Sequence, residues 1–240
     1  FRFSPMAGLK IIKRRIASVK STQQVTRVMK MVAAAKLRRA QEAMMNARPY
    51  SLTLREAIRD LSAHVERSAH PLLEIRDVDH VGIVVVTGDR GLAGSFNVNI
   101  LKRAQLLMNE NAHHKVHLVT VGKKGSEFFS RRGADLTGRM SGFFNQLNFN
   151  HAVELGETVT AQYLNSTMDR VYVVYNEFKS IIQQQVVVEQ LLPIVPDHEV
   201  QNAGAEIIFE PNQLEILNAI LPKHVNVQLW RILLESFASE

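Results

Sequence analysis

The sequence predicts an α/β fold in which an antiparallel coiled coil of N- and C-terminal helices carries an inserted Rossmann-like, open α/β domain. Three observations lead to this prediction. A heptad repeat runs over residues 9–61, strand-like and helical patterns alternate in the middle of the chain, and a helical stripe returns after Pro211. We therefore divide the chain into a coiled-coil helix at 1–70, an α/β domain at 71–210 and a second coiled-coil helix at 211–240.

The first helix is predicted from positions spaced alternately by three and four residues over seven heptads. The seam that these positions form is apolar at both ends and small or polar in the middle, where Ala33, Ala40 and Ala47 allow another helix to approach closely. Such a seam needs a partner helix. Residues 1–8 are expected to be a loose leader, and Pro49 is expected to cause a kink or a short break.

The charge of this segment is strongly asymmetric. Residues 1–48 contain twelve lysine and arginine residues against one acid, Glu42, so their net charge is +11, while the whole chain carries +6. Such a helix attracts an acidic surface, which could belong to a protein, a nucleic acid or a membrane. The chain has no cysteine, which excludes disulfides and thiolate metal sites. Its apolar runs are shorter than a membrane span, so we expect any membrane link to be indirect.

The middle of the chain contains the elements of an open sheet. β-branched and apolar runs predict strands, and amphipathic stretches between them predict helices. The expected strands are 81–87, 116–121, 135–140, 170–175, an antiparallel edge strand within 180–192 and a short strand at 206–209. One helix is expected after Ser95 or Asn97, either of which could cap it, a second contains Phe128 and Phe129, and a third spans 151–164. A turn is expected at 122–125 and a loop at 142–150.

The glycine-rich turn at 87–94 is the most prominent candidate site, since it follows a strand and precedes a helix. Its members are Gly88, Asp89, Arg90, Gly91 and Gly94. The dinucleotide fingerprint needs glycine at the position of Asp89, and the P-loop needs four residues between its glycines, where this chain has five. We therefore interpret the segment as a structural turn, with a nucleotide site as the weaker alternative and no cofactor expected.

Two other groups of residues are candidate chemical sites. His113, His114 and His117 precede the second strand without a carboxylate near in sequence, so a solvated turn is favoured over a metal site. Asp89 and Arg90 are favoured as a structural ion pair over a catalytic pair. The chain shows no arrangement of residues that indicates an enzyme by itself.

The C-terminal helix is predicted from one apolar stripe after Pro211, with a bend at Pro222. The stripe consists of Leu214, Leu217, Leu221, Val225, Leu229 and Ile232. It is the natural partner for the seam of the N-terminal helix, and the two helices should pair antiparallel. The α/β domain is then an insertion between them.

Several segments closely resemble the gamma subunits of F-type ATP synthases. They are residues 7–26, residues 29–41 (MKMVAAAKLRRAQ), residues 87–94 (TGDRGLAG), residues 191–193 (LLP) and residues 233–240 (LLESFASE). They span nearly the whole chain in the family's order. Ala93 stands where many members have cysteine, and the regulatory cysteine insertion of chloroplast members is absent. The family's C-terminal helix continues beyond Glu240, so the resemblance implies a longer helix than this sequence contains.

The resemblance implies a non-catalytic rotor subunit. Family members place the helix pair inside a ring of alternating alpha and beta subunits, and the α/β domain near the epsilon-type (mitochondrial delta) subunit and the membrane-embedded c-ring. Rotation then couples proton flow to ATP synthesis or hydrolysis. Carried over residue by residue, the expected contacts with beta-subunit loops are Met29, Lys30, Arg38, Arg39 and Gln41.

The sequence also bears on the cellular location of the protein and on two competing functions. The basic start without methionine favours the matrix side of the mitochondrial inner membrane, with the cytoplasmic face of a bacterial plasma membrane as the alternative. A basic coiled-coil nucleic-acid-binding protein is the competing function, although no aromatic residues for base stacking are interleaved with its cations. A Rossmann-type nucleotide enzyme is a third possibility, disfavoured by Asp89.

Overall fold

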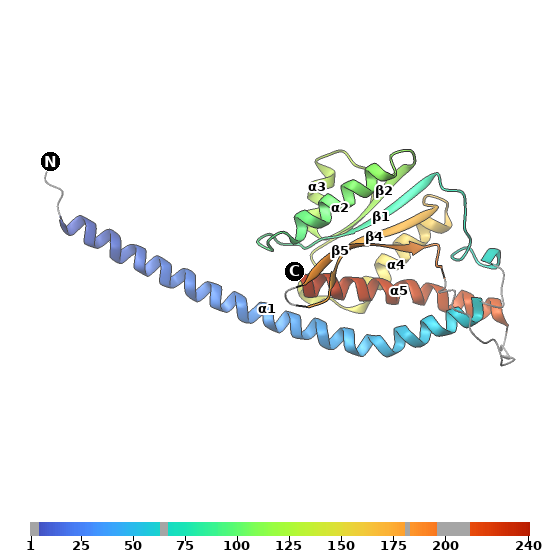
Figure 1. The fold of residues 1–240 in the computed structure, drawn as a ribbon, viewed down its shortest axis with the longest axis horizontal. Coiled ribbons are helices and arrows are strands. Elements are labelled where there is room, and N and C mark those ends of the chain that lie inside the picture. Colours follow the sequence, from blue (N-terminus) through green and yellow to red (C-terminus); the bar gives the residue numbers. More distant parts are fainter. Residues whose placement is uncertain (1–4, 63–66, 181–182, 196–211) are drawn as a thin grey trace.

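The computed structural model describes residues 5–62, 67–180, 183–195 and 212–240. A long helix, α1, extends beyond a layered α/β domain, and a second helix, α5, lies between α1 and the sheet (Figure 1). The helices are α1 (Pro5–Ser62), α2 (Phe96–Glu110), α3 (Lys123–Ser130), α4 (Phe149–Leu164) and α5 (Gln213–Ser239). The strands are β1 (His80–Val86), β2 (Lys115–Val121), β3 (Leu136–Met140), β4 (Arg170–Phe178) and β5 (Gln184–Leu192).

The five strands form one sheet in the order β3-β2-β1-β4-β5. Strands β1 to β4 are parallel, and β5 pairs antiparallel with β4 at the edge, as the alternation in 180–192 predicts. The order reverses between β1 and β4, which makes the sheet Rossmann-like. The strands expected near 81–87, 116–121, 135–140 and 170–175 are all present. The strand expected at 206–209 lies outside the described residues.

Helices cover both faces of the sheet. One hydrophobic core joins one face to α2 and α3 and includes Ile100, Leu101 and Ala104, the apolar stripe of α2. The other core joins the opposite face to α4, α5 and the C-terminal part of α1. Because β1 lies in the middle of the sheet, all but the first of its residues are buried, which explains its continuous β-branched sequence.

The predicted antiparallel helix pair is present, but α5 covers only part of the heptad seam (Figure 1). In α1, Ala40, Leu54, Ile58 and Leu61 are buried. Leu54, Ile58 and Leu61 belong to the same core as the stripe of α5, except that Leu214, predicted as the first member of that stripe, is 47% exposed. The seam residues of the other half of α1 are 50–67% exposed: Leu9, Ile12, Ile16 and Val19. The seam therefore has a partner only from about residue 37 onward.

The expectations for the two ends of the first helix are wrong, and of the kink or short break expected at Pro49 the break is absent. Helix α1 begins at Pro5, so residues 5–8 are helical rather than a loose leader, and it ends at Ser62, before His70. It also continues through Pro49 without a break. Pro49 is exposed, so water can replace the hydrogen bond that its missing N–H would have made. Helix α5 likewise continues through Pro222.

The expected caps and turns are also partly corrected. Ser95 occupies the N-cap position of α2 but makes no side-chain cap bond, and the side chain of Asn97 instead accepts from the backbone N–H of Gly88. The turn expected at 122–125 is limited to Gly122, because α3 begins at Lys123. The loop expected at 142–150 contains a short 3-10 helix at Phe144–Gln146 and the start of α4. Asn148 caps α4 through its side chain.

Candidate partner-binding surface and glycine-rich turn

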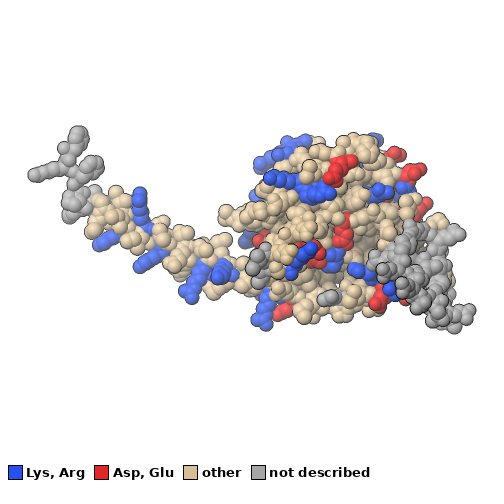
Figure 2. Space-filling model, viewed as in Figure 1, with Lys and Arg blue, Asp and Glu red and all other residues tan. Residues whose placement is uncertain are grey.

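We call residues 8–39 of α1 the exposed arm; they extend away from the rest of the chain up to about residue 36, where α5 begins to cover the helix (Figure 1). Lysine and arginine side chains project along the arm (Figure 2). The arm contains no aspartate or glutamate: its charged residues are Lys10, Lys13, Arg14, Arg15, Lys20, Arg27, Lys30, Lys36, Arg38 and Arg39. Uncompensated positive charge on an isolated helix produces a potential that attracts an acidic partner.

The exposed arm also presents apolar surface. The uncovered seam described above lies on it, and Val28, Met31 and Val32 are about half exposed as well. An extended apolar surface bordered by charged residues marks a site of protein–protein contact. The arm is therefore a surface that combines an apolar stripe with cations on the remaining faces.

The five sequence-predicted contact residues all lie on the solvent-exposed surface of α1. The side chain of Met29 is 54% exposed, and Lys30, Arg38, Arg39 and Gln41 are exposed as well. At about 100° per residue, Lys30 lies in the seam series with Gln41 close beside it, while Arg38, Arg39 and Met29 are spread around the other sides of the helix. Arg38 forms a 2.9 Å ion pair with Glu42, but both side chains are mostly exposed, so the pair contributes little to stability.

The glycine-rich turn is held by side chains that bond backbone amides. The buried Thr87 hydroxyl donates to the carbonyl of Val121 (3.0 Å) and accepts from the N–H of Gly125 (2.8 Å). The Asp89 carboxylate accepts from the N–H of Lys123 (3.0 Å) and of Gly142 (2.9 Å). These bonds join the carboxyl ends of β1, β2 and β3.

This geometry bears directly on the nucleotide alternative. The N-terminus of a helix is an anion site because its first N–H groups lack helical partners. At α3 the amides of Lys123 and Gly125 already bond Asp89 and Thr87, and the amide of Lys124 donates to the carbonyl of Gly88. Asp89 thus takes the place that a phosphate would occupy at this helix. These bonds suit the structural role predicted for the turn from its departures from both nucleotide motifs.

The end of α5 occupies the crevice between β1 and β4, where Rossmann-like sheets bind their ligands. The Ser239 hydroxyl donates to the carbonyl of Asn176 on β4 (3.4 Å). The Glu240 carboxylate lies against the backbone of Gly88 and accepts from the backbone of Arg90. Burial raises the pKa of Glu240, and the positive charge of Lys36 opposes this rise. The sequence singled out the turn but carries no local signal for this long-range contact.

The histidines are arranged differently from the expected cluster. His113 and His114 contact each other, with ring centroids 3.9 Å apart, while His117 turns toward β1. His117 Nε2 lies 3.1 Å from Nδ1 of His80, and its Nδ1 lies 2.7 Å from the carboxylate of Asp135. Within the part of the chain that the structure describes, no group of three or more potential ligands could hold a metal ion.

Replacing Asp89 with asparagine should test the structural role of the turn. The amide of asparagine can accept only through one oxygen, so one of the two backbone N–H groups loses its partner. We expect Asp89→Asn to lower the free energy of unfolding by about 1–2 kcal/mol, measured by urea denaturation. Glu110→Gln, which removes an exposed ion pair with Arg103 within α2, is the matched control. Equal effects of the two substitutions would contradict the role assigned to Asp89.

No helix within the described ranges is both long and apolar enough to span a membrane.

Comparison with known proteins identifies relatives over the entire fold. A family model described as ATP synthase matches residues 8–240. The ATP synthase gamma chains of Chlorobaculum tepidum and Chlorobium phaeobacteroides are 46% and 47% identical to this chain; each alignment covers 98% of this chain and 83% of the relative.

Two solved structures share the fold. The first is from the central stalk and c-ring of the Tetrahymena thermophila mitochondrial ATP synthase. It has a TM-score of 0.68 at 24% identity and covers 90% of this chain and 93% of that one. The second is from the rotor of the Euglena gracilis mitochondrial ATP synthase, with a TM-score of 0.65 at 18% identity, over 97% of this chain and 86% of that one.

Proposed function

This chain belongs to the family of ATP synthase gamma chains, and from that membership we propose that it is the rotor subunit of a central stalk. In this role it makes no nucleotide chemistry of its own. It couples rotation of a c-ring to the conformational cycle of the catalytic beta subunits. The observation that carries the proposal is the long basic helix α1, which pairs antiparallel with α5 and extends beyond the α/β domain (Figure 1).

The arm suits angle-dependent binding. Cations lie on several sides of the helix, but the apolar seam follows only one. A partner ring with acidic loops therefore meets a different surface of the arm at each angle of rotation. A ligand shifts a conformational equilibrium by its differential affinity for the two states, so such an arm favours one beta conformation over another.

The contacts with the beta-subunit loops are proposed at Met29, Lys30, Arg38, Arg39 and Gln41. Their exposure supports this assignment, because each side chain is accessible to another subunit. Their position also supports it, since they flank residue 37, near which α5 begins to cover the seam of α1.

The proposed partners are the alpha and beta subunits, an epsilon-type (mitochondrial delta) subunit and the c-ring. The similar solved structures described above come from a central stalk with its c-ring and from a rotor, which supports partners of this kind. The membrane link is then indirect, through the c-ring. The curated relatives described above are bacterial, which supports the cytoplasmic face of a bacterial plasma membrane over the mitochondrial inner membrane.

The nucleic-acid alternative has no support from any relative described above. The exposed arm also contains no aromatic residue on which a base could stack.

Co-purification tests the proposed function. The tagged chain is co-expressed with alpha and beta subunits, and the stoichiometry and ATPase activity of the recovered complex are measured. One copy of this chain per hexamer is the expected result. Recovery of the chain alone, also with the C-terminal helix extended to the length found in its relatives, would contradict the rotor function.

Neutralising three cations of the arm tests the proposed contacts. We expect Lys30→Gln, Arg38→Gln and Arg39→Gln together to weaken binding to the hexamer about tenfold, because exposed charge pairs contribute a few tenths to 1 kcal/mol each. Binding titrations at low salt measure the effect, which should shrink as salt rises.

The matched control makes the same charge change away from the arm, at Lys102, Lys115 and Arg131, which are exposed on the α/β domain. If both triple variants bind the hexamer equally well, the arm cations are not the contacts.

A further inference from the structure

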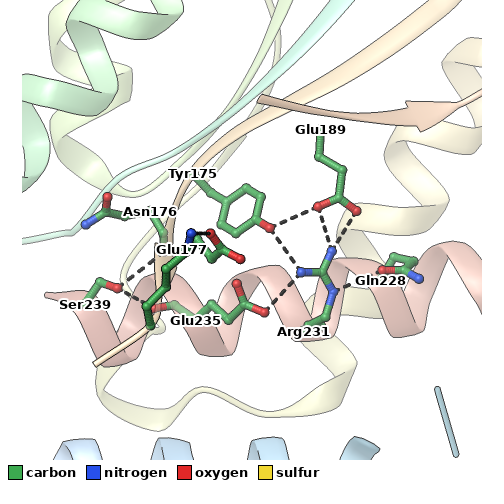
Figure 3. A network of polar contacts seen from close by, with 9 residues as sticks. Tyr175, Asn176, Glu177, Glu189, Gln228, Arg231, Glu235 and Ser239 are labelled. Carbon is green, nitrogen blue, oxygen red and sulfur yellow. Dashed lines mark hydrogen bonds and ion pairs between the residues drawn. The ribbon is translucent and has the colours of Figure 1, made fainter. Parts of the chain in front are cut away.

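Helix α5 is attached to the β4–β5 hairpin by a network of polar contacts centred on Arg231 (Figure 3). Its Nη2 donates to both carboxylate oxygens of Glu189 on β5, at 2.7 Å each. Its Nη1 donates to the hydroxyl of Tyr175 on β4 and to Glu235 on α5, both at 3.0 Å. Its Nε donates to Gln228 (3.1 Å). The guanidinium thus bonds two strands and its own helix at once.

The network is partly buried, and Glu235 Oε2 is left without a hydrogen-bond partner among the described residues. The side chain of Arg231 is 29% exposed, that of Glu189 39% and that of Glu235 14%. The Tyr175 hydroxyl donates to Glu189 (2.9 Å), so it bridges the same two charges. Burial lowers the pKa of Arg231, but the neighbouring Tyr175, Glu189 and Glu235 raise it, and the net shift is upward. Arg231 is therefore charged throughout the physiological range.

The remaining contacts of α5 with the domain are mainly apolar, through buried residues such as Leu229, Ile232 and Leu233. Hydrophobic contact is non-directional, so it resists separation of a helix from a sheet more than sliding along it. A guanidinium that bonds both oxygens of a carboxylate adds geometric specificity, because both bonds lengthen when the partners shift. The Arg231 network therefore fixes the axial and rotational position of α5 on the hairpin.

We propose that Arg231 is a positioning residue that keeps α5 in register with the β4–β5 hairpin and thereby lets torque pass between the α/β domain and the helix pair without slip. The inference rests on the proposed rotor function, in which the α/β domain faces the c-ring and the helix pair faces the catalytic subunits. Torque must then cross from strands to α5, and at that crossing the Arg231 network and the Ser239–Asn176 hydrogen bond are directional attachments, of which the network is the charged one.

The test uses the whole complex, with this chain as its gamma subunit, reconstituted into vesicles. Protons pumped per ATP hydrolysed, and the steepest proton gradient that the vesicles sustain, are measured for wild type and Arg231→Met. We expect the number of protons pumped per ATP, the pumping ratio, to fall about twofold or more in the variant. Residues of one ion-pair network are energetically coupled, so removing Arg231 weakens the attachment of α5 as a whole. The loss should grow as the opposing gradient grows, while hydrolysis with a protonophore stays near the wild-type rate.

A triple variant separates positioning from stability. Arg231→Met leaves Glu189 and Glu235 without their counter-charge, which destabilises the complex; adding Glu189→Gln and Glu235→Gln removes those unpaired charges. We expect the triple variant to regain thermal stability but not the pumping ratio. If the pumping ratio returns together with stability, the role of Arg231 is merely structural and the proposal is overturned.

Two further variants complete the design. Arg103→Met removes the exposed ion pair with Glu110 within α2 and should pump as wild type does. Arg231→Lys keeps the charge but cannot make the forked contact, and it decides the outcome if Arg231→Met does not assemble. Full coupling in Arg231→Lys would then overturn the proposal. A wild-type complex that fails to assemble or pump would instead contradict the rotor function.

Discussion

Gly122→Ala should lower the free energy of unfolding by more than about 3 kcal/mol. Gly122 has φ +88°, which side-chain-bearing residues rarely adopt, and it directly precedes α3. A Cβ atom at this position would overlap the backbone carbonyl of Thr87. Because Thr87 joins the ends of β1, β2 and α3, the backbone cannot move aside without breaking those contacts. Thermal or urea denaturation of the chain measures the effect.

Gly133→Ala is the matched control for Gly122→Ala. Gly133 also has a positive φ (+67°), but an added Cβ would meet no atom within 4 Å. We expect it to cost about 1 kcal/mol, the penalty of the left-handed conformation alone. If the two variants unfold at the same denaturant concentration, the close approach at Thr87 does not constrain the turn.

The free energy of unfolding should fall by about 2–3 kcal/mol as the pH is lowered from about 6.5 to about 4, through His224 alone. Burial, with the positive charges of Arg55 and Arg231, lowers the pKa of His224 to about 4. The negative charge of Glu189 opposes this shift but is the smallest of these effects. Its Nδ1 has no hydrogen-bond partner among the described residues. In the unfolded chain the imidazole titrates near its ordinary pKa, so the unfolded state binds more protons in this range. Stability is therefore complete above about pH 6.5 and is lost as the pH falls.

Urea denaturation at neutral pH and near pH 5 measures this dependence, with His224→Gln as the comparison. The variant should show a shallower pH profile. His70, whose pKa burial also lowers, remains in the variant and accounts for part of the residual slope, together with the carboxylates. Identical profiles of the wild type and the variant between about pH 6.5 and 5 would exclude His224 as the source.

Local pattern was sufficient to predict the order of the elements. Heptad spacing predicts α1, β-branched runs predict the strands, and the alternation within 180–192 predicts the antiparallel edge strand. Each of these signals is a period in hydrophobicity, which depends only on neighbouring residues and on which face they bury. The charge of the arm is likewise a property of composition alone.

The errors of prediction come from contacts that cross the chain. Asn97 bonds the backbone N–H of Gly88 rather than capping its own helix. The role of Asp89 depends on Gly142, 53 residues away, and so could not be read from the motif around it.

The sequence by itself determined that a long basic coiled-coil helix and a shorter apolar one flank an open α/β domain, because periodicity and charge are local properties. Only the tertiary structure decided how much of the seam α5 covers, that Asp89 and the end of α5 occupy the places where a Rossmann-like domain binds its ligand, and that Arg231 meets Glu189. The physical reason is that these features depend on contacts between segments far apart in the chain, which hydrophobic period and composition do not encode.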